Sequence, residues 1–131
     1  MPRFVALAAA LAALVVLAAG CGFGPATEEG RISEAADTYL RSLASGDTAE
    51  ACEQLTSAAR ADLEGGCAAA LRRIASRTGA GRLDAAADAG VDPEALGDRG
   101  SAVVHELDVR LTLVRDGGTW RIDGGHQLRP A

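Results

Sequence analysis

Residues 103–122 read VVHELDVRLTLVRDGGTWRI, and this stretch decides the fold class. Apolar and polar residues alternate over 103–113, which is typical of a β-strand with one buried face. The sequence Arg115-Asp116-Gly117-Gly118 then predicts a hairpin turn, because its glycines adopt the positive φ angles that tight turns need. A second strand is expected over 119–123. The C-terminal third of the chain is therefore predicted to be an antiparallel hairpin.

The alternation assigns the side chains of this hairpin to two faces. Inward positions on the first strand are Val103, His105, Leu107, Val109, Leu111 and Leu113. Outward positions are Val104, Glu106, Asp108, Arg110 and Thr112. On the returning strand, Trp120 and Ile122 are expected to point inward. The predicted sheet therefore has one apolar face, which other elements must cover.

Helical periodicity occupies the region before the strands. Apolar residues recur at three- and four-residue steps over 27–45, and Gly46 is expected to end that helix. Asp47-Thr48-Ala49-Glu50 matches a capping box that opens a second helix, with a second cap near Thr56-Ser57. A third helix is predicted from Cys67 to about Arg77. Its arginines are expected to face water: Arg72, Arg73 and Arg77.

The segment 78–100 is broken by glycines and a proline and gives no single prediction. Part of it, about Arg82 to Val91, fits either a helix or a weak edge strand. Asp84, Asp88 and Asp92 fall at intervals of four, so a helix would place them on one face. This spacing differs from that of a calcium-binding loop, and a solvated acidic face is the favoured interpretation.

The first twenty residues have the composition of an export signal. Arg3 is the only charge, and sixteen apolar residues, 4–19, follow it. A charged start, a short apolar run and small residues at the end are typical of a secretory signal peptide. The run is shorter than the roughly 20 residues that span a bilayer comfortably. An uncleaved membrane anchor is the alternative.

Ala18-Ala19-Gly20-Cys21 resembles the lipobox of bacterial lipoproteins. In that family the signal is cut before the cysteine, whose sulfur carries a diacylglyceryl group with acyl chains such as palmitate. The resemblance implies that residues 1–20 are the signal peptide and that Cys21 is lipidated. Residues 21–28 would then form the lipidated cysteine and a flexible tether, and residues 29–131 an extracytoplasmic domain. The protein would be held by lipid at the extracytoplasmic face of the bacterial cell membrane.

The three cysteines fit this interpretation. If Cys21 is lipidated, Cys52 and Cys67 remain as a pair, and export places them where disulfides persist. Such a bridge would close a loop of about 15 residues and contribute roughly 3 kcal/mol. Two buried thiols or a metal pair are the alternatives. A metal is disfavoured because neither cysteine belongs to a C-x-x-C motif and no histidine is near in sequence. No cofactor is expected.

A further set of motifs runs through the predicted helices and the last strand: Tyr39-Leu40, Ser45-Gly46-Asp47, Ala51-Cys52, Leu55, Ala58, Leu63, Cys67 and Gly117-Gly118-Thr119-Trp120-Arg121-Ile122. This set resembles exported lipoproteins of high-GC Gram-positive bacteria, which have a cone-shaped fold similar to nuclear transport factor 2 and ketosteroid isomerase. The resemblance implies an α+β domain in which two or three N-terminal helices pack on a small antiparallel sheet.

Charge and fold together favour a binding module without chemistry. The net charge is −5, whereas nucleic-acid binding needs a basic stripe, so no nucleic acid is expected as a partner. The concave face of the sheet is expected to form a shallow pocket for a small apolar ligand or a segment of an envelope protein. Tyr39 and Trp120 would line this pocket or simply fill the core, which is the favoured interpretation.

Two other functions stay open. In a small isomerase or dehydratase, His105 would be the general base, since it is the one candidate expected on the apolar face. His126 is expected to be solvated in the tail. In a structural subunit of an envelope complex, two copies would pair as a homodimer through their sheets, although Glu106, Asp108 and Arg110 oppose a dry interface.

Overall fold

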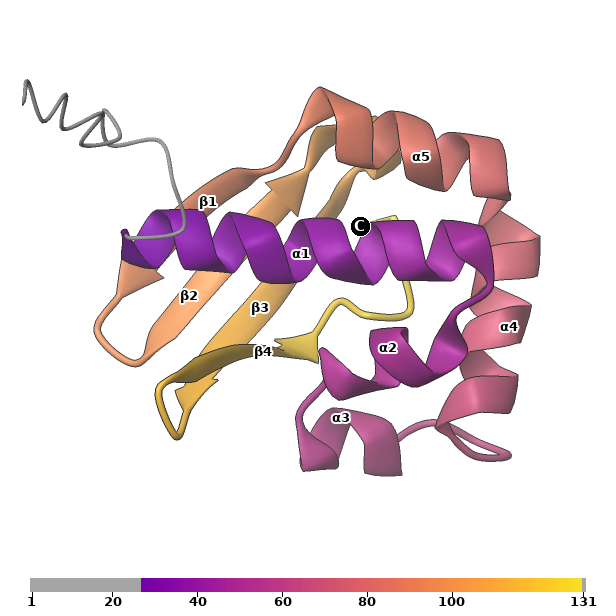
Figure 1. The fold of residues 1–131 in the computed structure, drawn as a ribbon, viewed down its shortest axis with the longest axis horizontal. Helices are drawn as coiled ribbons and strands as arrows, with labels where there is room; N and C mark the ends of the chain where they lie inside the picture. The colour runs from indigo at the N-terminus through magenta and orange to yellow at the C-terminus, as the bar shows by residue number, and fades with distance from the viewer. Residues whose placement is uncertain (1–26, 131) are drawn as a thin grey trace, which may run out of the picture.

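The computed structural model describes residues 27–130, which form an α+β fold (Figure 1). Five α-helices come first: α1 (Glu28–Ser45), α2 (Thr48–Glu53), α3 (Ser57–Ala61), α4 (Cys67–Thr78) and α5 (Ala80–Ala89). Four strands follow: β1 (Asp92–Leu96), β2 (Arg99–Val104), β3 (Val109–Asp116) and β4 (Thr119–Gly124), with a 3₁₀ turn, η1 (His105–Leu107), between β2 and β3. The predicted signal peptide and Cys21 lie outside the described residues.

The sheet is antiparallel throughout, with strand order β1-β2-β3-β4, and helix α1 packs against one of its faces (Figure 1). Helix α1 crosses this face and contacts β1, β2 and β4. None of the helices within residues 27–130 is long and apolar enough to span a bilayer.

Helix α1 has the boundaries that its sequence predicts. The Thr27 hydroxyl accepts a hydrogen bond from the Gly30 N–H at 2.9 Å, which caps the first turn. Gly46 ends the helix at φ 80°, a left-handed conformation that glycine adopts without strain. One stripe of the helix is buried against the sheet and the other helices: Ile32, Ala35, Ala36, Tyr39, Leu40, Ser42 and Leu43.

Gly100 marks the closest approach of α1 to the sheet. A Cβ atom at this position would lie 2.5 Å from Ile32 Cδ1 and 2.9 Å from the Glu94 carbonyl oxygen. Any other residue would therefore push α1 away from β2 or disturb the pairing of β1 with β2. Glycine is required here for space, since its φ angle is not in the left-handed region.

Both predicted caps in the α2–α3 region are confirmed. The Asp47 carboxylate accepts from the Glu50 N–H at 3.1 Å, and the Thr56 hydroxyl oxygen accepts from the Ala59 N–H at 3.0 Å. Thr56 also joins this region to β4, because its N–H donates to the Ile122 carbonyl at 2.9 Å. The connection between α2 and α3 therefore covers the outer edge of β4.

The prediction of one continuous strand over 103–113 is wrong. Strand β2 ends at Val104, η1 reverses the chain, and Asp108 then takes a left-handed conformation at φ 52° before β3 begins. Val104 is consequently buried and Val103 is not, which inverts the predicted faces before the turn. The predicted inward positions after it are confirmed: Leu107, Val109, Leu111 and Leu113 are all buried.

Residues 82–89 are helical, so the alternative of an edge strand over Arg82 to Val91 is wrong. Helix α5 buries Leu83, Ala86 and Ala87, and the edge strand is β1, which carries Pro93. Proline is tolerated there because an edge strand leaves some N–H groups unpaired. Asp92 belongs to β1 and does not share a helical face with Asp84 and Asp88.

Cys52 and Cys67 form a disulfide, as predicted. Their Cα atoms are 6.1 Å apart, and the bridge joins α2 to the first residue of α4. Helix α4 is therefore covalently fixed to the helical layer at its N-terminus.

Candidate functional site

Tyr39 and Trp120, the aromatic residues predicted to line or fill a pocket, both lie in the core. Tyr39 is fully buried, and its hydroxyl donates a hydrogen bond to the His126 carbonyl oxygen at 2.5 Å. Burial raises the pKa of the Tyr39 phenol above its ordinary value. Trp120 is 3% exposed, and its indole N–H donates to a Glu28 carboxylate oxygen at 2.6 Å. These side chains occupy the space between α1 and the sheet.

His105 does not join them. It opens the η1 turn, its side chain is 71% exposed, and its Nε2 lies 4.0 Å from an Asp92 carboxylate oxygen. The expectation that it faces inward is wrong because the 3₁₀ turn rotates it out of the strand alternation. The structure therefore separates His105 from Tyr39 and Trp120.

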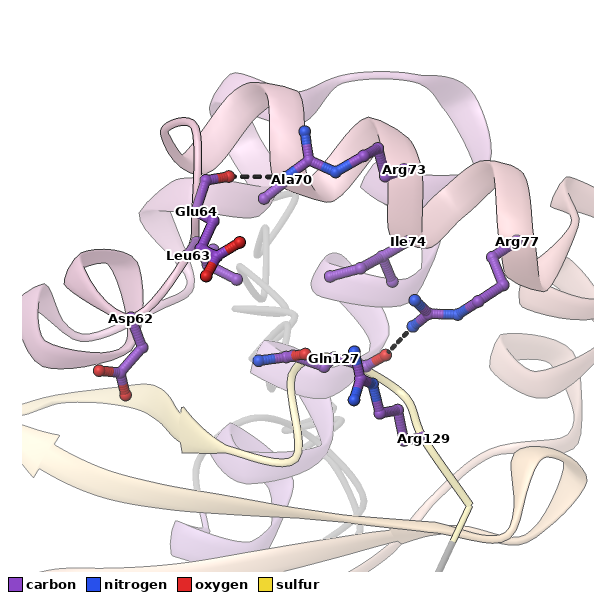
Figure 2. A pocket seen from close by; sticks show the side chains of 9 residues that line it. All are labelled: Asp62, Leu63, Glu64, Ala70, Arg73, Ile74, Arg77, Gln127 and Arg129. Atoms are coloured by element: carbon purple, nitrogen blue, oxygen red, sulfur yellow. Dashed lines mark hydrogen bonds between the residues drawn. The ribbon is translucent and has the colours of Figure 1, made fainter.

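A groove lies between the α3–α4 connection, helix α4 and the C-terminal tail (Figure 2). Its volume is about 390 Å³. The floor is apolar and consists of the buried side chains of Leu63, Ala70 and Ile74. The rim is polar and comes from three segments that are distant in sequence: Asp62 and Glu64, Arg73 and Arg77, and Gln127 and Arg129.

Two arginines project from α4 along one side of the groove. Arg73 and Arg77 are four residues apart, so they lie on the same helical face. The Arg73 guanidinium donates to the Glu64 carbonyl oxygen at 2.6 Å, and that of Arg77 donates to the Gln127 carbonyl oxygen at 2.5 Å (Figure 2). Each arginine therefore fixes one of the other two segments through its backbone.

These guanidinium groups are not neutralised by carboxylates. Within residues 27–130, no carboxylate oxygen lies within 4.0 Å of a side-chain nitrogen of Arg73, Arg77 or Arg129. Asp62 and Glu64 line the groove but form no ion pair with them. The groove thus carries three cations and two separate anions in a chain whose net charge is −5.

The C-terminal tail is held in place by buried contacts. Besides the bond from Tyr39 to the His126 carbonyl, Leu128 is 5% exposed and takes a left-handed φ of 54°. Gly125, at φ 76°, lets the tail turn, and a Cβ there would clash with the Arg110 carbonyl oxygen. The tail places Gln127 and Arg129 at the groove.

His126 is buried, which contradicts the expectation of a solvated side chain. It is 6% exposed, and neither ring nitrogen has a hydrogen-bond partner within the described part of the chain. Burial lowers the pKa of His126 below its ordinary 6.5, although the charges of Asp62 and Asp123 act in the opposite direction. Sequence alone did not reveal this burial because the tail has no periodic pattern.

A second groove, also about 390 Å³, lies between α1, α2 and the β3–β4 turn. Its lining includes Arg31, Glu34, Glu50 and the edge of Trp120. Arg31 is already paired with Glu28 at 2.9 Å. This groove therefore contains no unpaired arginine, in contrast to the groove at α4.

Sequence reasoning placed Arg73 and Arg77 in water but did not identify them as a site. Their spacing of four residues was the available signal, whereas nothing local connected Arg129 to them. Across residues 27–130, no group of three or more His, Cys, Asp or Glu side chains is placed to hold a metal ion. Comparisons with models of protein families, with curated proteins and with solved structures found no match.

Proposed function

We propose that this chain is a lipid-anchored extracytoplasmic binding module that holds its ligand, or a segment of an envelope protein, in the groove at α4. The observation that carries the proposal is the set of three unneutralised arginines that line the groove. Convergent polar groups in a concave site are typical of ligand sites. The module is proposed to act by binding, without a covalent step.

The groove is preformed, which supports a binding role. The disulfide fixes the start of α4, the Tyr39 hydroxyl fixes the tail, and Arg73 fixes the α3–α4 connection. A site that is already ordered loses less conformational entropy when a ligand binds. More of the interaction energy with the ligand then contributes to affinity, because less of it is needed to order the site.

The position of the groove also fits a membrane anchor on Cys21. The first turn of α1 and helix α4 lie at opposite ends of the long axis of the molecule (Figure 1). The six residues after Cys21 reach about 20 Å at most. Helix α1 has 18 residues, so it extends about 27 Å. The anchored end would face the membrane, and the groove would face away from it.

A second candidate is a homodimer formed through the uncovered face of the sheet. Leu96, on the edge strand β1, is 72% exposed, and it is the large apolar residue that favours this surface. The shallow hollow beside it also contains Glu94, Arg99 and Arg110. Sedimentation at micromolar concentration tests it: a monomer rejects this candidate and leaves the groove proposal intact.

Two measurements on the native product test the main proposal. Intact-mass analysis should show Cys21 as the first residue with a diacylglyceryl adduct, and an unmodified chain would reject the anchor. The anchored protein is then captured from a solubilised envelope, and bound proteins and small molecules are identified by mass spectrometry.

The capture is repeated with a variant that combines Arg73→Ala and Arg77→Ala, and with Arg72→Ala as the matched control. Arg72 is an exposed arginine on the same helix that does not line the groove. The proposal expects a companion that the wild type and the control retain and the double variant loses, while circular dichroism shows the double variant still folded at the temperature of the capture. Equal capture by all three proteins rejects it.

A further inference from the structure

We infer that the groove at α4 recognises an oxyanion, a carboxylate or a phosphate group, on a small ligand. This inference rests on the proposed function, because it names the ligand class of the same site. It is carried by the arrangement of Arg73, Arg77 and Arg129 over Leu63 and Ile74 (Figure 2).

The arginines retain most of their hydrogen-bonding capacity. A guanidinium has five N–H donors in a planar fork that matches the two oxygens of a carboxylate or phosphate. Arg73 and Arg77 each direct one nitrogen to a backbone carbonyl oxygen. Arg129 makes no side-chain hydrogen bond within residues 27–130 and is exposed at the open side of the groove. Donors therefore remain for an oxyanion.

Charge balance points to the same ligand class. Arg73 and Arg77 repel one another because like charges four residues apart on a helix are destabilising. Arg129 adds a third cation from the tail, and an anion among the three would relieve this repulsion. Asp62 and Glu64 lie across the groove, where they disfavour a second anionic group and favour a hydroxyl or amine donor.

The size and floor of the groove limit the rest of the ligand. Its volume of about 390 Å³ is near the lower end of the range for small-molecule sites. Leu63, Ala70 and Ile74 close the bottom of the groove but are almost fully buried, so most of the surface that a ligand can reach is polar. The expected ligand is therefore the size of a metabolite, with one anionic head and further polar groups.

A purely structural role for the arginines makes a different prediction. Arg73 and Arg77 hold backbone carbonyls, so their loss alone does not separate binding from stability. Arg129 holds nothing within the described residues, and Arg129→Ala should leave the thermal unfolding midpoint unchanged. A change in ligand affinity on this substitution would therefore report on binding alone.

The test measures binding by calorimetry to the full-length protein in a neutral detergent, with ionic strength matched by sodium chloride. The probes are inorganic phosphate, acetate, phenyl phosphate, benzoate and benzyl alcohol. At least one of the anions should bind, and benzyl alcohol, which carries no anionic group, should not bind. The tighter of the two aromatic anions distinguishes a phosphate from a carboxylate ligand.

Arg129→Ala should weaken the tighter probe about tenfold, because it removes a charge-assisted contact. Arg72→Ala should leave the affinity unchanged. Absence of binding by every anion overturns the inference, as does an equal loss in both variants. If the anions fail while the envelope companion still depends on Arg73 and Arg77, the inference fails and the proposed function stands. If the anions bind but capture of the companion does not depend on these arginines, the proposed function fails and anion binding by the groove stands.

Discussion

The two long helices of this molecule use their arginines differently. On α1, Arg31 and Arg41 each lie within 3.0 Å of a carboxylate on their own helix, and Arg41 also reaches Asp88 of α5 at 3.0 Å. On α4, Arg73 and Arg77 contact backbone carbonyls instead. The first arrangement neutralises charge on the surface. The second fixes the backbone and leaves positive charge directed at a groove, and this difference singles out one end of the molecule.

Loss of the disulfide should cause the largest loss of stability among these predictions, and it should affect α4 more than α1. Cys52→Ala combined with Cys67→Ala frees the start of α4, and the 15-residue separation predicts a loss of about 3 kcal/mol in the free energy of unfolding. Denaturant unfolding measures the loss. Hydrogen exchange should show weaker protection in α4 than in α1, and an equal effect on both helices would contradict the proposed frame of the groove.

A substitution at Gly100 tests how closely α1 packs against the sheet. Gly100→Val places atoms where Ile32 Cδ1 and the Glu94 carbonyl already lie, so we expect a loss of about 2 kcal/mol from overpacking. The neighbouring Ser101→Ala, which adds no bulk, is the control. Thermal unfolding measures both, and a neutral Gly100→Val would show that α1 does not pack as closely as described.

His126 makes the tail beside the groove sensitive to pH. Its folded pKa lies below the ordinary 6.5, so the unfolded chain takes up protons more readily as pH falls below about 6.5. Stability is therefore present above that pH and is lost progressively in acid. The midpoint of thermal unfolding, measured at pH 7.5 and 5.5, should fall further for the wild type than for His126→Phe. Equal shifts would show that other groups cause the acid sensitivity.

The smallest effect is expected from the paired arginines of α1. Arg41→Ala should lower the free energy of unfolding only slightly, because both of its ion pairs are exposed and its carboxylate partners remain hydrated. The cost should shrink further in 1 M sodium chloride, since salt screens surface pairs. Arg77→Ala, which removes a hydrogen bond to the tail, should keep its cost in salt. If salt changes the stability losses of Arg41→Ala and Arg77→Ala equally, the arginines of α1 and α4 do not act by different interactions.

Local signals account for the parts of the fold that were predicted correctly. The caps at Asp47 and Thr56, the stop at Gly46 and the turn at Gly117-Gly118 each depend on a few adjacent residues. The disulfide was predicted by counting cysteines in a chain that was expected to be exported, and the bridge is present.

The errors arose where tertiary packing overrides local pattern. The turn at η1 contains no glycine or proline, so an alternating sequence concealed it, and His105 was placed on the wrong face. Helix α5 is rich in alanine and has only a narrow buried stripe, which made it look like a strand. The groove was not predictable because Arg77 and its partner Gln127 are 50 positions apart.

That separation has a consequence for the order in which the molecule is built. A chain synthesised from its N-terminus delivers the two arginines of α4 well before the backbone that one of them holds. Until β4 has paired and Leu128 is buried, the groove at α4 lacks the side that the C-terminal tail forms. Ligand binding by the groove should therefore appear last in refolding, after the helices have acquired their circular-dichroism signal. Cleavage within the last five residues should abolish this binding and leave most of the helix content intact.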